Sequence, residues 1–255
     1  MLLAIDIGNS NITLGIFHGE ELRATWRIAT DVHRLADEYA VLILNLLPRQ
    51  GIESSQVKDS IICSVVPPLT VTFEDLCCRY FGSKPLIVEV GIKTGMRILY
   101  DNPKEVGADR VADAVAAFRK YGGPVIVVDF GTATVFDAIS KEGDYIGGAI
   151  APGVDVAAEA LFERASKLPR IELVAPSSAI GKDTVSSMQS GLIFGYVGLI
   201  EGLVNRFQRE LGGGAKVVGT GGSAGMMAKE SSVIDVLDPD LTLVGLRMIH
   251  EMNCS

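Results

Sequence analysis

Apolar residues in this sequence fall into short runs that end at glycine-containing turns or at prolines. Runs of this length, bounded in this way, are typical of buried strands. They occur in both halves of the chain, and the order of elements in the first half is repeated in the second. The predicted strands are 2–7, 12–17, 22–28, 60–66 and 86–90, then two or three strands between 125 and 150, and finally 216–219 and 233–236.

Between these runs, apolar residues recur every three or four positions, which predicts amphipathic helices. Residues 34–47 show this spacing, and Pro48 and Gly51 mark the end of that helix. No low-complexity linker separates the halves, so we predict an α/β fold from a duplicated unit, divided into residues 1–115 and 116–255. The other predicted helices are 70–81, one that begins near 107, one from about 154, 186–211, a short helix after 219, and a closing helix from about 241.

The strongest sign of duplication is a pair of similar segments, each an apolar run followed by Asp-x-Gly and small polar residues. Asp6-Ile7-Gly8-Asn9-Ser10 ends the first run, and Asp129-Phe130-Gly131-Thr132 ends the second. Glycine lets a backbone approach an anion, and exposed N–H groups with Asn9, Ser10 or Thr132 can donate to phosphate oxygens. A carboxylate there suits Mg²⁺ or a monovalent cation. A single copy of this pattern also occurs in ordinary turns. Two copies in matching register predict a pair of phosphate-binding hairpins. In this the sequence resembles the actin, sugar-kinase and Hsp70 superfamily.

Composition narrows the possible partners. The chain has 255 residues, 48% of them hydrophobic, and a net charge of −8, which argues against a nucleic-acid partner. An anionic substrate would need a local positive group. We expect no signal peptide, and the most apolar stretch, 39–47, is too short to span a bilayer. The four cysteines lack the spacing of metal ligands, which indicates reduced thiols in a cytoplasmic protein; they are Cys63, Cys77, Cys78 and Cys254.

A candidate catalytic group lies at the start of the helix near 107, in the segment Gly107-Ala108-Asp109-Arg110. Asp109 there is favourable to the helix dipole, which is sufficient reason for its presence. It is also placed to accept a proton from a substrate hydroxyl that attacks a γ-phosphate. Arg110 can form a two-pronged contact with a substrate carboxylate, which lysine cannot. Both interpretations stay open from these residues alone.

Taken together, six short motifs are similar to those of type III pantothenate kinases. They occur in the family's order and cover the chain from Met1 to about Ile249. The motifs are Asp-x-Gly-Asn-Ser at 6–10, Gly-Ala-Asp-Arg at 107–110, Asp-Phe-Gly-Thr-Ala-Thr at 129–134, Gly-Gly-x-Ile-x-Pro-Gly at 147–153, Gly-Lys-Asp-Thr at 181–184 and Ser-Gly-Leu-Ile-Phe-Gly at 190–195.

This resemblance implies a duplicated actin-like (ribonuclease H-like) two-lobed fold, with mixed sheets and helices on both faces. It implies ATP-dependent phosphorylation of pantothenate, the first step towards coenzyme A, in a homodimer. Asp109 would be the catalytic base, Asp6 would lie near nucleotide-bound Mg²⁺, and Asp129 would lie at a monovalent cation, K⁺ or NH₄⁺. The residues implied at ATP are Asp6, Ile7, Gly8, Asn9, Ser10, Asn11, Ile12, Thr13 and Thr132, and those at pantothenate are Tyr100, Gly107, Ala108, Asp109, Arg110 and Thr184.

Some of these positions have simpler explanations. Thr184 could cap the helix that follows it, and Tyr100 could be a hydrophobic plug beside an exposed turn. Gly221 and Gly222 form a strand-to-helix turn that suits an adenine or ribose, although such turns are common. Glycines recur every three or four residues in the longest predicted helix, which predicts close packing within the subunit or across a dimer; they are Gly191, Gly195, Gly198 and Gly202.

Two other classes of function compete with a small-molecule kinase. A conformational ATPase like actin or Hsp70 needs additional subdomains or a peptide-binding extension, for which 255 residues leave no room. A non-catalytic regulator with the same fold would need a helix-turn-helix or a basic stripe to contact DNA, and the sequence shows neither.

Overall fold

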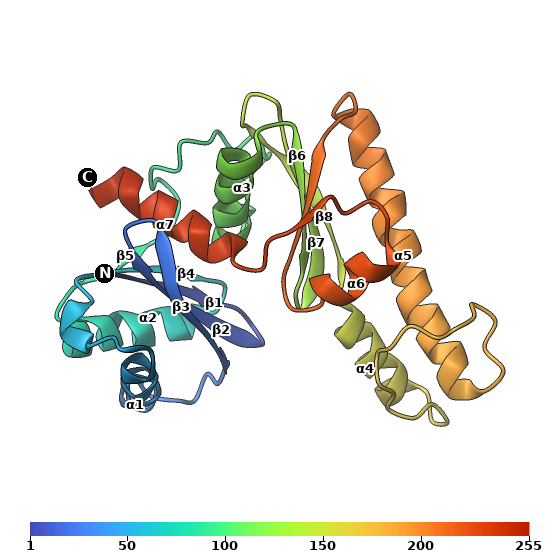
Figure 1. Cartoon of the computed structure of the whole chain (residues 1–255), viewed down its shortest axis with the longest axis horizontal. Coiled ribbons are helices and arrows are strands. Elements are labelled where there is room, and N and C mark those ends of the chain that lie inside the picture. The colour runs from blue at the N-terminus through green and yellow to red at the C-terminus, as the bar shows by residue number, and fades with distance from the viewer. Residues whose placement is uncertain (255) are drawn as a thin grey trace. The chain divides into compact units, whose positions relative to one another are not determined.

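The computed structural model describes residues 1–254 and divides the chain into two units (Figure 1). Unit 1 consists of Met1–Met96, Asp101–Ala116 and Leu241–Ser255. Unit 2 consists of Arg97–Tyr100 and Ala117–Asp240. The sequence places the boundary after residue 115, one residue from the division in the structure. It does not anticipate that the C-terminal helix belongs to unit 1, or that residues 97–100 belong to unit 2.

Unit 1 is built on a five-stranded mixed sheet in the order β3-β2-β1-β4-β5. A β-hairpin joins β1 to β2, and β1 pairs in parallel with β4 on its other side. The strands match the predicted apolar runs except that β5 is only two residues long, since its pairing with β4 stops at Ile62↔Ile87. Their bounds are β1 Leu2–Ile7, β2 Asn11–His18, β3 Glu21–Ala29, β4 Asp59–Ser64 and β5 Leu86–Ile87.

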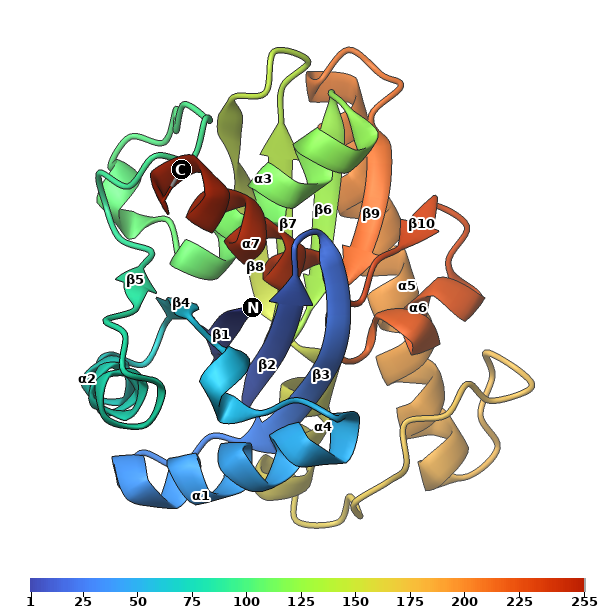
Figure 2. The same ribbon diagram turned by 60° about the vertical axis from the view of Figure 1, so that its left-hand side comes forward.

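Helices cover both faces of this sheet (Figure 2). Leu3, Ile5 and Ile7 of β1 face helices α1 and α2, where Tyr39 and Phe73 complete an apolar core. Leu2 and Ala4 face the opposite way, towards helices α3 and α7. This alternation follows from the two-residue period of a strand. The helices span α1 Ala36–Leu46, α2 Pro67–Leu76, α3 Ala108–Tyr121 and α7 Leu241–Cys254.

Unit 2 repeats the same sheet. Its strand order, β10-β9-β6-β7-β8, reproduces that of unit 1 when β6, β7, β8, β9 and β10 are matched with β1 to β5. The β6–β7 pair is again an antiparallel hairpin, and β6 again pairs in parallel with β9. The predicted duplication is therefore present in the topology. The bounds are β6 Val125–Phe130, β7 Ala133–Ile139, β8 Tyr145–Pro152, β9 Lys216–Thr220 and β10 Val236–Leu237.

Strand β10 begins three residues later than the sequence predicts. The Asp235 carboxylate accepts the N–H of Val217 at 2.7 Å, a donor that a backbone carbonyl would otherwise pair. The Asp235 N–H in turn donates to the Val217 carbonyl at 3.0 Å. The Asp235 side chain therefore replaces a backbone carbonyl at the first pairing position between β9 and β10, and regular strand pairing starts at Val236.

Three helices pack on unit 2: α4 (Val154–Arg164), α5 (Thr184–Glu210) and α6 (Ala224–Glu230). The longest, α5, buries Leu192, Ile193, Ile200 and Val204 in the apolar core. Among residues 1–254 it is the one helix long and apolar enough to cross a membrane by length and composition, and core helices pass the same test. A Cβ built at any of its four spaced glycines meets nothing within 4 Å in the described structure, so the predicted packing partner is not within the subunit.

Candidate active site

Asp6, on β1, is one of four residues in a polar row that crosses the sheet of unit 1. Since Leu2 and Ala4 face α3 and α7, the two-residue period puts the Asp6 side chain on the same face. Asp6 lies opposite Thr13 on β2 and opposite Cys63 on β4. Thr13 in turn lies opposite Arg27 on β3. One face of the sheet therefore presents a guanidinium, a hydroxyl, a carboxylate and a thiol in line.

The first turn of α3 adds further charged groups near this row. Ala112 and Val115 of α3 pack on the same face of the sheet as Cys63. Asp109 lies one helical turn before this contact, and its Oδ1 accepts the N–H of Arg110 at 2.8 Å. A Cβ at Gly107 would lie 2.4 Å from that oxygen, so glycine is required for the carboxylate to occupy this position. Asp109 thus does stabilise the helix start, as the simpler interpretation expects.

Asp6 and Asp109 lie close enough for their charges to interact. The pKa of Asp6 is raised from its ordinary value to about 6, chiefly by burial and to a smaller extent by the negative charge of Asp109. The hydrogen bond from the Cys63 thiol and the positive charge of Arg27 oppose this shift and lower the pKa. The structure therefore brings together two carboxylates that the sequence separates by about a hundred residues.

Cys63 is a site residue that sequence reasoning missed. Its thiol donates to Asp6 Oδ1 at 3.2 Å, and the side chain is fully buried. Burial, with the charges of Asp6 and Asp109 next, raises the pKa of this thiol well above its ordinary value. The thiol is therefore protonated at neutral pH and acts as a hydrogen-bond donor. Only the strand register reveals this contact, and no local sequence signal indicates it.

The tip of the first hairpin is exposed and shaped by its glycine. The Gly8 N–H donates to the Asn11 carbonyl at 3.0 Å, which closes a tight turn over Asn9 and Ser10. Asn9, Ser10 and Asn11 are exposed, whereas Ile7 and Ile12 on either side are buried. The predicted phosphate-binding segment is accordingly an exposed polar turn held on a buried hairpin.

In unit 2, the turn of the second hairpin lies close to the backbone of two other segments, at Gly153 and at Gly221. The Thr132 carbonyl accepts the N–H of Gly153, at the start of α4, at 2.9 Å. Gly221 has φ +91°, and a Cβ there would lie 2.3 Å from Asp129 Oδ1. Only glycine combines this backbone conformation with such a close approach. The structure thus brings Asp129, Thr132 and Gly221 together within unit 2.

Two predicted substrate residues also lie in unit 2. Tyr100 is half-buried beside the start of β8, where a Cβ built at Gly147 would lie 3.6 Å from its ring. The residues after it form the exposed turn that the sequence predicts. Thr184 is exposed and is the first residue of α5. It lines an open cavity of about 570 Å³ together with Leu168, Gly181, Lys182, Asp183, Ser187 and Met188.

Thr184 does not cap α5, which corrects the simpler interpretation of that residue. The cap is Asp183, whose carboxylate accepts the N–H of Ser186 at 2.9 Å. The Asp183–Ser186 spacing is a capping signal, visible in the sequence, that could have identified this cap. The Thr184 side chain is therefore not needed to start the helix.

No group of three or more His, Cys, Asp or Glu side chains able to hold a metal ion occurs within residues 1–254. Mg²⁺ in phosphotransfer sites is commonly held by one or two carboxylates together with the phosphates of the substrate. Asp6 fits that pattern, because it supplies carboxylate oxygens without a protein cage.

The fold defines the class of protein. Two sheets of the same strand order, each with an Asp-x-Gly hairpin, form the actin-like two-lobed α/β fold. A Campylobacter jejuni protein assigned to the Baf family of transcriptional activators is similar, with a TM-score of 0.64 at 20% identity, covering 99% of this chain and 98% of that one. Component A of (R)-2-hydroxyglutaryl-CoA dehydratase from Acidaminococcus fermentans has a TM-score of 0.57 at 16% identity, covering 100% and 99%.

Sequence comparisons identify the family. The model of the type III pantothenate kinase family matches residues 2–206. The type III pantothenate kinase of Roseiflexus sp. (strain RS-1) is 55% identical over 255 residues, covering both chains completely. That of Moorella thermoacetica is 52% identical over 253 residues, covering 99% of this chain and all of the relative. The chain belongs to the type III pantothenate kinase family.

Proposed function

We propose that this protein transfers the γ-phosphoryl group of ATP to the primary hydroxyl of pantothenate, the first step of coenzyme A biosynthesis. The observation that carries the proposal is the packing of Ala112 and Val115 of α3 on the face of the sheet that bears Asp6, which brings Asp109 near Asp6. Phosphoryl transfer needs a group that orients the attacking hydroxyl and a group at the nucleotide phosphates. Unit 1 supplies both on the α3 face of its sheet.

Asp109 is the proposed catalytic base. As the substrate oxygen forms its bond to the γ-phosphorus, the hydroxyl proton passes to the Asp109 carboxylate, and the bond from the γ-phosphorus to the bridging oxygen breaks to release ADP. The hydrogen bond that Asp109 accepts from the Arg110 N–H fixes one of its oxygens. The base is thereby oriented before substrate arrives.

The nucleotide phosphates are assigned to residues 6–13 of the first hairpin. The exposed turn at Asn9 and Ser10 offers N–H and side-chain donors, and Asp6 lies beneath it on β1. Bound Mg²⁺ would neutralise the phosphate charge, with Asp6 as its protein carboxylate. In unit 2, Thr132, Gly221 and Gly222 are assigned to ATP, and Asp129 to a monovalent cation, K⁺ or NH₄⁺.

Pantothenate is assigned to Tyr100, to Gly107 to Arg110, and to Thr184. An acidic protein with a net charge of −8 offers this anion no long-range attraction, so a local cation must offset the loss of water at the site. Arg110 is 8% exposed and lies beside the proposed base. We assign it to the pantothenate carboxylate.

We also propose that the protein is a cytoplasmic homodimer. The exposed glycine stripe on α5 is open to close approach by another helix, and no part of the described subunit fills it. Solution mass from light scattering tests this assignment directly: a mass near 54 kDa, twice that of the 27.1 kDa chain, supports it, and a mass near that of one chain contradicts it.

A coupled assay for ADP tests the function. We expect ADP formation that depends on pantothenate and Mg²⁺ and is stimulated when K⁺ or NH₄⁺ replaces Na⁺. ADP formation without pantothenate would instead indicate a conformational ATPase, and nucleotide binding without turnover would indicate a regulator. Equal turnover in Na⁺ and K⁺ would remove the monovalent-cation site and leave the kinase assignment standing.

A further inference from the structure

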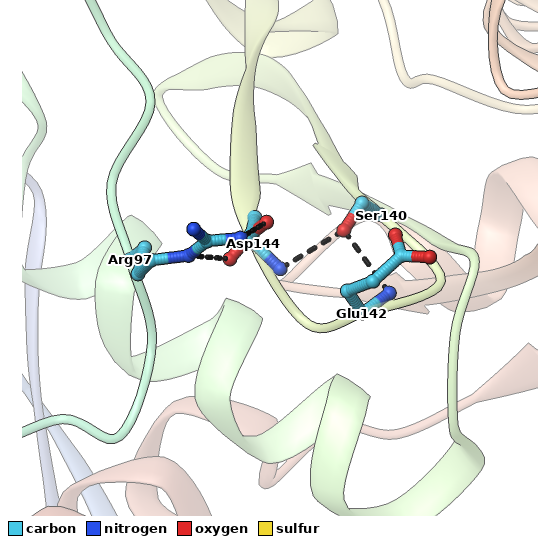
Figure 3. A network of polar contacts seen from close by, with 4 residues as sticks. All are labelled: Arg97, Ser140, Glu142 and Asp144. Atoms are coloured by element: carbon cyan, nitrogen blue, oxygen red, sulfur yellow. Dashed lines mark hydrogen bonds and ion pairs between the residues drawn. The ribbon is translucent and has the colours of Figure 1, made fainter.

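Arg97 begins the segment 97–100 of unit 2, and a polar network outside the proposed catalytic groups joins it to the turn between β7 and β8 (Figure 3). The Asp144 carboxylate accepts two hydrogen bonds from Arg97, one from Nε at 2.7 Å and a second from a terminal guanidinium nitrogen. This two-pronged geometry fixes the guanidinium in direction as well as in distance. It also holds the pKa of Asp144 below its ordinary value.

The Asp144 side of this contact is rigid. Ser140 Oγ accepts the N–H groups of Glu142 at 3.2 Å and Asp144 at 3.1 Å, and the Ser140 N–H donates to the Asp144 carbonyl at 2.8 Å. Gly143 completes the turn with φ +87°, and a Cβ there would lie 2.5 Å from the Phe118 ring. The turn between β7 and β8 therefore presents Asp144 in one position.

The backbone next to Arg97 continues the sheet of unit 2. The Arg97 carbonyl accepts the Tyr145 N–H at 2.9 Å, and the Leu99 N–H donates to the Tyr145 carbonyl at 2.8 Å. Tyr145 is itself anchored, since its buried hydroxyl donates to Asp137 at 2.6 Å. Residues 97–99 thus pair with the first residue of β8 beside the Arg97–Asp144 contact.

Tyr100 is the next residue, and its ring lies over the same strand. The Tyr100 and Tyr145 ring centroids are 6.3 Å apart, and a Cβ at Gly147 would lie 3.6 Å from the Tyr100 ring. We propose that the Arg97–Asp144 pair sets the position of Tyr100 for recognition of pantothenate, so that Arg97 and Asp144 are positioning residues of the kinase. This inference rests on the proposed function, which assigns Tyr100 to the substrate.

The first test is the kinetics of Arg97→Ala. We expect KM for pantothenate to rise about two- to fivefold, the effect of losing an exposed ion pair, while kcat and KM for ATP change less than twofold. Arg170→Ala is the matched control, because Arg170 pairs with Glu159 at 3.0 Å and its side chain is 70% exposed, against 74% for Arg97. Arg97→Lys keeps the charge without the two-pronged contact and should fall between the wild type and Arg97→Ala.

A double-mutant cycle with Tyr100→Ala decides whether Arg97 acts through Tyr100. We expect Tyr100→Ala to raise KM for pantothenate, and Arg97→Ala to add nothing in that background. Full additivity of the two effects, or an unchanged KM in Arg97→Ala, overturns the inference while leaving the kinase assignment intact. An unchanged KM in Tyr100→Ala overturns it through the assignment of Tyr100. Absence of pantothenate-dependent turnover in the wild type would instead contradict the proposed function.

Hydrogen exchange supplies a readout independent of activity. In Arg97→Ala, the amide of Leu99 should exchange faster than in the wild type, because its hydrogen bond to Tyr145 loses the adjacent ion pair. The amide of Val128, in the centre of β6, should be unaffected. Unchanged protection at Leu99 would show that backbone pairing alone holds the segment, which contradicts a positioning role for Arg97.

Discussion

Asp6 and Asp129 occupy the same place in two copies of one sheet, but their surroundings differ. The row through Asp6 runs from Arg27 through Thr13 to Cys63, all of them polar or polarisable. The row through Asp129 runs from Ile150 through Val135 to Thr220. The duplicated topology therefore carries a row with two charged groups of opposite sign in unit 1, and a row in unit 2 whose one charged group lies between a threonine and two apolar residues.

The turns that follow the two carboxylates also differ. In the first hairpin, the Gly8 N–H reaches the carbonyl of Asn11, whereas in the second the Gly131 N–H reaches that of Ala133, so the second loop is one residue shorter. The backbone at Gly221 lies close to the Asp129 carboxylate in unit 2. In unit 1, the group near Asp6 is Asp109, in the first turn of α3. Under the proposed function, the groups assigned to phosphoryl transfer lie in unit 1, and the glycine-shaped turn of unit 2 serves as a cradle for the nucleotide.

The largest effect is expected from removing the proposed base. Asp109→Asn keeps the shape and the oxygen that accepts the Arg110 N–H but cannot take a proton, so kcat should fall by about 10²–10⁴. Asp37→Asn is the control, since Asp37 lies in the first turn of α1. A kcat near that of the wild type in Asp109→Asn would leave Asp109 as a helix-stabilising residue only.

The cradle of unit 2 is tested by paired glycine variants. Gly221→Ala forces a side chain into a left-handed backbone conformation and against Asp129, which should cost at least ~2 kcal/mol of unfolding free energy. At Gly8 the new Cβ would lie 3.0 Å from the Asn11 carbonyl oxygen, and the backbone is not left-handed, so the cost should be smaller. Thermal unfolding measures both. Equal shifts in Tm would mean that the two hairpins tolerate substitution alike.

Arg110→Lys tests whether substrate recognition belongs to unit 1. The variant keeps the positive charge and loses the two-pronged contact, so KM for pantothenate should rise by the equivalent of about 1–3 kcal/mol and KM for ATP should not. Helix α7 corresponds to α3 in the duplication, since α3 follows β5 and α7 follows β10. The first turn of α7 has no acidic residue, so it has no counterpart of Asp109. If only KM for ATP moves, Arg110 belongs to the nucleotide.

The charged row should cost unit 1 stability at neutral pH. The pKa of Asp6 is about 6 in the folded protein and lower when unfolded, so the folded state binds this proton more tightly. Its contribution to stability is present at low pH and is lost as the pH rises through 6. Asp6→Asn should therefore be more stable than the wild type at pH 7, by on the order of 2 kcal/mol, and about equal at pH 4.

Urea unfolding at both pH values, without nucleotide or Mg²⁺, makes this comparison. Asp101→Asn, in an exposed turn, controls for the loss of one negative charge. A destabilised Asp6→Asn at pH 7 would show that the carboxylate is favourable where it lies. ATP binding by the same variant should be lost, which would separate the stability of Asp6 from its function.

The sequence is sufficient for the parts of this fold that depend on neighbouring residues. Both hairpins and the duplicated order of elements follow from local patterns, and the structure confirms them. The start of β10 does not, because Asp235 takes a ladder position with its side chain. The proximity of Asp6 to Asp109 and Cys63 depends on a parallel register and on the packing of α3, and both join residues far apart in the sequence.

Cys63 gives the smallest and most specific test of the comparison, since Thr220 holds the equivalent register position beside Asp129. Cys63→Ala removes the donor to Asp6, and a lost hydrogen bond of about 0.5–1.5 kcal/mol should raise KM for ATP by about two- to tenfold. Cys63→Ser keeps a donor and should restore most of the affinity. Cys77→Ala is the matched control, because Cys77 is equally buried but packs in the apolar core on the α1 and α2 face of the sheet. If Cys77→Ala raises KM for ATP as much as Cys63→Ala does, lost packing explains both variants, and the thiol does not orient Asp6.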